Sequence, residues 1–420
     1  MNPPGLYNPI VEPLVRATEF YYVYKVGVIQ GQSALVTTLV ERWHPDTHTF
    51  HLLTGECAVT LEDMALILGI PINGLLVTGT TMTSQEAMEA ECLHQFGVAP
   101  TTSDCRGSFI KMTWIKNGKE GLILNDQVAM KKYVKCHILL LFGSILFADK
   151  SGSAVHWKFL PLLHDFSRIH EISWGSASLA HLYRALCRAS RFDCKEMDGS
   201  LTLLHMWAWI RMPLLAPIPG TPQFFPLANR WRNWEHHNWP YRYHIVAYFR
   251  GLLDEVQEGQ FVWEAYGVDQ IEADVIPEDI RSQSEIWSAT IPLISFETLE
   301  WHATDKCRRQ FGFVQGVPHQ ERSLDGQHGE ILTGPKNLDW SVTYRFWIMQ
   351  WTNRYSHVLI HELVPLHHPL DLYMCWYREK YGTHLHLSDL VLEENQEGVT
   401  NPNQPHQPEP QPSLQRQQPP

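Results

Sequence analysis

Histidines near the C-terminal end are the side chains best suited to hold a metal ion. The string His361-Glu362-Leu-Val-Pro365 matches the first half of the HExxH motif of zinc proteases. That chemistry needs a second histidine one helical turn after His361, and Pro365 stands there. Further histidines follow, but without cysteine partners or a regular spacing. We therefore expect no metal site and no cofactor.

Carboxylates offer a second kind of chemistry, because a transposase needs three of them to hold metal ions at a phosphodiester. Four candidates stand out in the sequence: Asp149, Asp165, Glu171 and Glu300. The plainer interpretation, which we favour, is that Glu300 and Asp305 anchor helix ends or pair with Arg308 and Arg309.

Other catalytic motifs are missing from the sequence. There is no GxxxxGK[ST] phosphate loop, no GxGxxG loop and no GxSxG nucleophile turn. The Gly-Asp and Gly-Asn-His-Glu runs that hold the two metals of a metallophosphatase are absent too, and no lysine is set apart for a Schiff base. We predict no catalytic residues and a protein that is not an enzyme.

Arginines alternate with aromatic residues between residues 229 and 250. The candidate contacts there are Arg230, Trp231, Arg232, Trp234, Trp239 and Arg242. Arginine can bind phosphate while aromatic rings stack on bases, so this pattern could bind single-stranded nucleic acid. Trp and Arg also dominate protein interfaces. Packing of these rings in the core is the third and favoured reading, because the chain has 16 Trp throughout.

A second basic candidate lies on a predicted helix between residues 173 and 191. Leu179, Leu182 and their neighbours fall on one face, and Arg184, Arg188 and Arg191 on another. The first face should pack, whereas the arginine face is expected to be solvated or to contact a partner.

Composition limits the class of protein. The formal net charge of −12 argues against a surface given over to nucleic acid, although local basic faces remain possible. Eight cysteines show no CxxC pair, so we expect reduced thiols and an intracellular location. The start of the chain does not have the pattern of a secretory signal. The longest apolar run, residues 138–148, is too short to cross a membrane and is expected to be a core helix.

Apolar periodicity predicts a mainly α fold with a few short strands. Helices are expected at residues 33–43 with Ser33 as a possible cap, after a capping box at Thr60, and at 201–211 before Pro213. A further helix is expected at 340–355, and an extended segment at 49–53. The last twenty residues hold seven Pro and six Gln, which predicts a disordered tail over 395–420.

Four segments, in this order, resemble the plant mobile domain family. They are residues 50–79 (FHLLTGECAVTLEDMALILGIPINGLLVTG), residues 141–213 with SWGSASLAHLYRALCRAS, residues 292–318 with PLISFETLEWHATDKCRRQFG, and residues 340–355. The resemblance implies a single domain over about residues 20–394, after an N-terminal extension at 1–19.

The resemblance also implies a function. Family members are transposon-related nuclear proteins, and those named for maintenance of meristems support gene expression and transposon silencing. Some carry a serine/threonine phosphatase domain or are thought to act beside such a phosphatase. We therefore expect a nuclear regulatory or assembly factor that acts through protein partners, with no membrane contact. The alternatives are a nucleic-acid-binding remnant of a transposase and a copy still encoded by a transposon.

Overall fold

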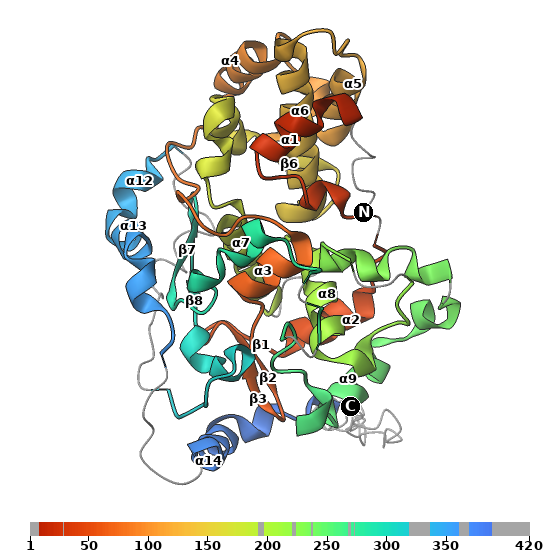
Figure 1. Cartoon of the computed structure of the whole chain (residues 1–420), viewed down its shortest axis with the longest axis vertical. Coiled ribbons are helices and arrows are strands. Elements are labelled where there is room, and N and C mark those ends of the chain that lie inside the picture. Colours follow the sequence, from red (N-terminus) through yellow and green to blue (C-terminus); the bar gives the residue numbers. More distant parts are fainter. Residues whose placement is uncertain are drawn as a thin grey trace, which may run out of the picture.

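The computed structural model describes residues 8–27, 29–191, 197–220, 224–236, 238–267, 270–272, 274–318, 337–360 and 369–388. The predicted mainly α fold with few short strands is confirmed (Figure 1). The tail expected to be disordered, 395–420, lies outside the described residues. Across the described part of the chain, no helix is both long and apolar enough to cross a membrane.

Thirteen α-helices have described bounds. They are α1 (Glu12–Ala17), α2 (Ser33–Glu41), α3 (Leu61–Leu68), α4 (Gln85–Phe96), α5 (Met112–Glu120), α6 (Gln127–Leu141), α7 (Trp174–Ala189), α8 (Leu201–Arg211), α9 (Val246–Asp254), α10 (Glu278–Arg281), α12 (Trp340–Thr343), α13 (Arg345–Thr352) and α14 (Pro369–Tyr381). Short 3-10 turns connect many of them, among them η7 (Pro213–Leu215), η8 (Leu227–Trp231), η9 (Trp234–His236) and η10 (Trp239–Tyr243).

The described strands form three small antiparallel sheets. The first has the order β1 (Trp43–His44), β2 (Thr49–Leu52), β3 (Gly55–Cys57), the second the order β4 (Cys105–Arg106), β5 (Phe109–Lys111), β6 (Ala154–His156), and the third is the hairpin β7 (Ile291–Ser295) and β8 (Thr298–His302). Ile291 lies opposite His302 in that hairpin, and every residue of both strands is buried.

The helices surround a centre made by α3, α7 and the β7–β8 hairpin. Figure 1 shows α4, α5 and α6 at one end of the molecule, α2, α8 and α9 on one flank, α12 and α13 on the other, and α14 beside the first sheet. One large apolar cluster runs through this arrangement. A small second cluster forms where Tyr373 and Tyr377 of α14 pack, with the Tyr377 hydroxyl donating to the Leu52 carbonyl at 2.9 Å.

Local signals account for the start and end of α3. The Thr60 hydroxyl accepts from the Asp63 amide while the Asp63 carboxylate accepts from the Thr60 amide, which is the predicted capping box. Gly69 ends the helix with a φ of 66°, in the left-handed region that glycine adopts without strain. Helix α8 runs over the predicted 201–211, and Pro213 follows it.

Some expected details were wrong. Gln32, not Ser33, caps α2, because its side-chain oxygen accepts from the Ala34 amide. The single helix expected at 340–355 is divided at Tyr344 into α12 and α13. The β7–β8 hairpin was missed: β7 (IPLIS) is almost wholly apolar and shows no alternation, and although β8 (TLEWH) does alternate, its polar residues are buried as well.

Candidate functional site

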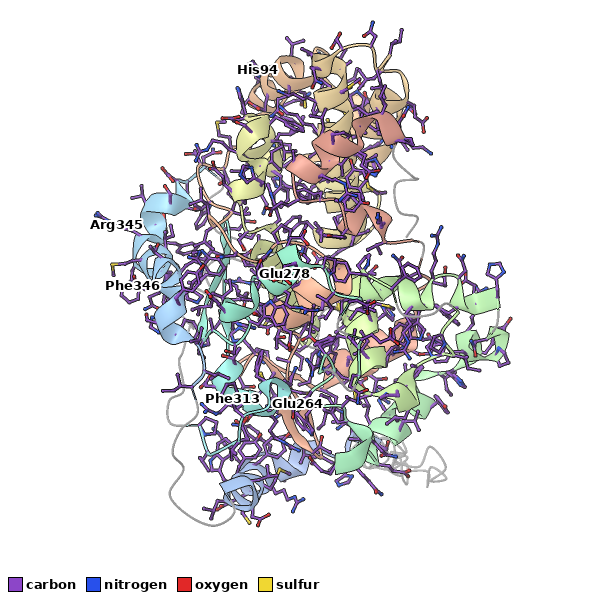
Figure 2. The ribbon with its side chains drawn as sticks, viewed as in Figure 1. His94, Glu264, Glu278, Phe313, Arg345 and Phe346 are labelled. Carbon is purple, nitrogen blue, oxygen red and sulfur yellow. The ribbon has the colours of Figure 1, made fainter. Side chains whose placement is uncertain are left out.

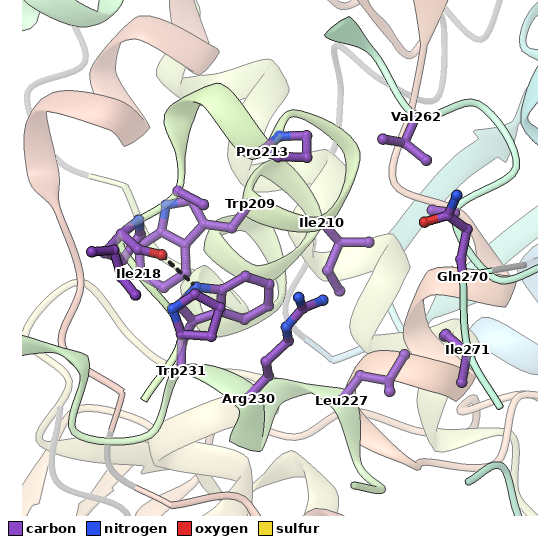
Figure 3. Close-up of a pocket in the computed structure, with 14 residues that line it drawn as sticks. Trp209, Ile210, Pro213, Ile218, Leu227, Arg230, Trp231, Val262, Gln270 and Ile271 are labelled. Atoms are coloured by element: carbon purple, nitrogen blue, oxygen red, sulfur yellow. Dashed lines mark hydrogen bonds between the residues drawn. The ribbon is translucent and has the colours of Figure 1, made fainter. Parts of the chain in front are cut away.

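A pocket of about 380 Å³ lies beside the C-terminal end of α8. Because Pro213 cannot continue that helix, the chain turns and runs back along it, and Pro217 and Pro219 contribute to the wall. Trp209 comes from α8, and Arg230 and Trp231 come from η8 (Figure 3). The opposite side includes residues from 262 to 271 (Figure 3). Segments up to about sixty residues apart thus form one concave site.

Hydrogen bonds hold the two tryptophans of this pocket in place. Trp209 Nε1 donates to the Tyr241 hydroxyl at 2.9 Å, and that hydroxyl donates to the Leu215 carbonyl at 2.6 Å. Trp231 Nε1 donates to the Pro217 carbonyl at 2.9 Å. Both indole N–H groups are therefore satisfied, and the pocket has rigid aromatic walls.

The pocket offers one charge. Arg230 is half-buried with its guanidinium carbon 5.1 Å from the Trp231 ring, and burial lowers the pKa of Arg230 from its ordinary value. An arginine remains protonated in proteins, so a partly desolvated positive charge borders an apolar cavity. The remaining lining residues are apolar, apart from Gln270. Among the described residues that line the pocket, none carries a carboxylate, imidazole, thiol or hydroxyl group that could act as nucleophile or general acid–base. Such a pocket suits recognition of an apolar group next to an anion.

The expectation that tryptophans at 231 and 234 could stack on bases is corrected by their burial. Trp231 and Trp234 are 2% and 0% exposed and pack with Trp209 and Tyr241, as the core interpretation required. Trp234 Nε1 donates to the Gln30 carbonyl at 2.9 Å.

The other candidates of this stretch differ in exposure. Arg232 and Arg242 are exposed, and Arg230 lies in the pocket. Trp239 belongs to η10, but its side chain lies outside what the structure describes.

The predicted arginine face on α7 is not a surface stripe. Arg184 is buried, and its Nε donates to the carboxylate of Glu300. Arg188 is half-buried and paired with Asp198, and Arg191 alone of the three is exposed. Periodicity placed these arginines on one face correctly, but it could not show that β8 covers the first of them.

The carboxylates of the transposase hypothesis do not converge. Asp149 accepts from Ser151 and Ser153, Asp165 caps a short helix, and Glu171 pairs with Arg168. Within the described ranges, the one group of three or more His, Cys, Asp or Glu side chains with metal-ligand spacing is His48, Cys187 and Glu300.

Three further expectations concern the partners of Glu300, the partner of Arg309 and the broken zinc motif. Glu300 does not anchor a helix end; it is paired with Arg184 and with His48, whose Nε2 lies 2.8 Å from a Glu300 oxygen. Arg309 pairs with Glu258 instead. The broken zinc motif at His361–Pro365 lies outside the described residues.

An exposed apolar stripe follows helices α12 and α13. Val342, Phe346 and Met349 are 70%, 57% and 56% exposed and recur at the four- and three-residue spacing of one helical face. Figure 2 shows Phe346 and Arg345 pointing outward from α13. Large exposed apolar groups in one line mark protein contact sites more often than nucleic-acid sites. The sequence pattern predicted a helix here, but it did not indicate which face of the helix is exposed.

Comparison with known proteins gives relatives in one plant. A protein of Arabidopsis thaliana described as a serine/threonine-protein phosphatase 7 long form homolog is 37% identical over 395 residues, covering 89% of this chain and 29% of that protein. Protein MAIN-LIKE 1 is 31% identical over 352 residues, covering 82% and 66%. Protein MAINTENANCE OF MERISTEMS is 28% identical over 330 residues, covering 77% and 66%.

The chain thus spans between 29% and 66% of the length of these three relatives. No solved structure matches it. The profile of the plant mobile domain matches residues 19–378, which include α3, α7, the β7–β8 hairpin and the pocket beside α8. On this match and on the identity to its relatives, the chain belongs to the plant mobile domain family.

Proposed function

We propose that this protein is a non-enzymatic assembly factor of the nucleus that binds protein partners through the pocket beside α8. The observation that carries the proposal is the described part of the pocket lining, which combines fixed aromatic and proline walls with Arg230 and includes no side chain suited to catalysis. Its volume of about 380 Å³ accommodates one large side chain of a partner. The occupant we propose is one apolar or aromatic side chain of a partner, seated between the aromatic and proline walls.

The cellular role follows from the relatives. One of them is named for the maintenance of meristems, and another is described as a phosphatase 7 long form homolog. We propose that the protein supports gene expression, transposon silencing and meristem maintenance, and that a serine/threonine phosphatase of that type is among its partners. The exposed stripe of α12 and α13 gives a second surface for such an assembly.

Binding of nucleic acid is the second candidate. Arg232 and Arg242 are exposed, and Tyr243 is 66% exposed beside them, so phosphate contact and one stacked base are sterically open. The burial of Trp231 and Trp234 weakens this reading, because neither ring is accessible to a base.

The test is affinity purification of the tagged full chain from plant nuclei, with and without nuclease, followed by mass spectrometry. Two variants alter the pocket: Ile218→Glu at its exposed rim and Arg230→Glu inside it. Leu93→Glu is the matched control, because Leu93 is an exposed apolar residue of α4 that is not among the pocket residues.

Partners that survive nuclease, remain on the control and are lost from both pocket variants would support the proposal. Partners retained by both variants would contradict it. Loss of all partners on nuclease treatment, with binding that weakens steeply as salt rises, would favour the nucleic-acid candidate.

A further inference from the structure

A second convergence of reactive side chains lies far from the pocket, where the first sheet meets α7 and β8. His48 is in the turn between β1 and β2, Cys187 is near the end of α7, and Glu300 is in the middle of β8. His48 offers a ring nitrogen, Cys187 its Sγ and Glu300 a carboxylate oxygen, and these atoms all lie within 4.8 Å of one another. All three side chains are buried. Residues more than a hundred positions apart therefore meet at one point.

We propose that His48, Cys187 and Glu300 bind a zinc ion. One nitrogen, one sulfur and one oxygen donor make a set that suits zinc, whereas calcium and magnesium select oxygen donors. Zinc bonds of about 2.0–2.3 Å in a tetrahedron place the ligand atoms about 3.3–3.6 Å apart. His48 Nε2 and Glu300 Oε2 are 2.8 Å apart, so that pair would open by about 0.5 Å. Cys187 Sγ lies within 4.8 Å of both atoms and would close by at most about 1.2 Å.

Groups around the three side chains support this assignment. Trp43 Nε1 donates to Cys187 Sγ at 3.2 Å. Burial raises the pKa of the Cys187 thiol well above its ordinary value, so the metal itself would have to displace the thiol proton. Arg184 donates to Oε1 of Glu300 and therefore leaves Oε2 directed to His48. Arg184 Nη2 is itself held by the Leu299 carbonyl at 3.1 Å. Such outer contacts are what fix metal ligands in orientation.

The backbone of His48 is a further indication. Its φ of 54° lies in the left-handed region, which non-glycine residues seldom adopt, although histidine does so more often than most. This turn directs the imidazole inward to Glu300.

Zinc binding would change the protons held at the site. The Cys187 thiol would lose its proton to solvent, and His48 would carry its proton on Nδ1 so that Nε2 can bind the metal. Zinc with one thiolate and one carboxylate is neutral, and the charge of Arg184 remains. Three protein ligands leave a fourth position for a water molecule, which would bind as hydroxide by releasing one proton to solvent and so balance the charge of Arg184. Without zinc the same residues form a buried pair of Arg184 and Glu300 with His48 hydrogen-bonded to it.

The experiment measures the metal content of the full chain, purified without a histidine tag and dialysed against metal-free buffer, by plasma mass spectrometry. We expect one zinc per chain in the wild type and none in Cys187→Ser. The matched control is Cys307→Ser, at another buried cysteine that is not one of the three ligands, and it should keep its zinc.

Cobalt gives a second readout that does not depend on the variants folding. Cobalt added to the metal-free wild type should produce the charge-transfer absorption of a thiolate–cobalt bond and the visible bands of a tetrahedral site. A wild type that is folded by circular dichroism, carries no zinc and gives no such absorption would overturn the proposal. Zinc retained by a folded Cys187→Ser variant would overturn it equally.

Discussion

Replacing Arg211 tests how a buried charge holds α3 against α8. Arg211 is 0% exposed, and its Nη2 donates to Asp63 Oδ1 at 3.0 Å. The Tyr266 hydroxyl donates to the same oxygen at 2.6 Å, while Asp63 Oδ2 accepts from the amide and the hydroxyl of Thr60, each at 2.7 Å. The carboxylate that caps α3 is therefore neutralised by one arginine of α8.

Arg211→Met keeps most of the side-chain volume and removes the charge. Asp63 would then stay buried without its cation, and we expect a loss of about 3–5 kcal/mol in the free energy of unfolding. Since domains unfold at about 5–15 kcal/mol, this is a large share of the total. Arg250→Met is the matched control: Arg250 pairs with Glu41 near the surface, with side chains 24% and 25% exposed, and should cost less than about 1 kcal/mol.

The assay is urea unfolding of the full chain followed by tryptophan fluorescence, for Arg211→Met, Asp63→Asn and the double variant. If the two residues act as a pair, the double variant should lose less than the sum of the single variants by about 1.5–3 kcal/mol. Effects that add to within about 0.5 kcal/mol would refute the pairing. Should Arg211→Met not fold, Tyr266→Phe in a cycle with Asp63→Asn tests the same carboxylate, at about 1.5–3 kcal/mol for the lost bond.

Three further predictions concern stability. Burial lowers the pKa of His44 and His51 to about 3, so between about pH 6.5 and pH 3 the unfolded chain binds protons that the folded chain does not. The free energy of unfolding should therefore fall as the pH drops through this window, measured as urea midpoints from pH 7 to 4.5. The fall should be less steep in His44→Phe. Gly175→Ala should destabilise the fold by about 1–3 kcal/mol, because a Cβ there would lie 2.7 Å from a backbone carbonyl oxygen. Gly118→Ala, in open space on α5, should instead stabilise the fold by up to about 1 kcal/mol, measured by the same urea unfolding. Tyr377→Phe should cost about 1 kcal/mol in urea unfolding, because a buried carbonyl oxygen of β2 loses its donor; no change would mean that α14 does not depend on that contact.

Helix positions could be predicted because they depend on neighbours in the sequence. The capping box at Thr60, the stop at Gly69 and the stop at Pro213 are local signals, and the structure has α3 and α8 where those signals place them. A core helix was expected over residues 138–148, and α6 continues there as a buried π-helical turn of residues 142–146, for which the sequence carries no local signal.

No pocket was predicted from the sequence. The aromatic and arginine pattern indicated Arg230 and Trp231 as candidate contact residues, and both line the pocket. The prolines between residues 213 and 219 could have indicated a turn of the chain beside these residues, but no such turn was predicted from them. The far wall, with Val262 and Ile271, could not have been predicted, because nothing local joins these residues to α8.

Buried arginines show where sequence reasoning must fail. Arg42, Arg184 and Arg211 are each almost fully buried, and each pairs with an acid at least 116 positions away, Asp254, Glu300 and Asp63 respectively. A charged residue on a predicted helix is assigned to solvent by default, since its partner cannot be seen in the sequence.

These three pairs join elements that lie far apart in the sequence. Arg42 follows α2 and pairs with Asp254 at the end of α9. The Asp254 carboxylate also accepts hydrogen bonds from the Leu387 and Ser388 amides. Apolar contacts tolerate small shifts in packing, whereas a buried charge is stable only opposite its partner. We infer that the pairs fix which helix faces meet, so that the pocket beside α8 and the cluster at Glu300 keep their geometry. It follows that breaking a pair should loosen the site near it before it unfolds the chain.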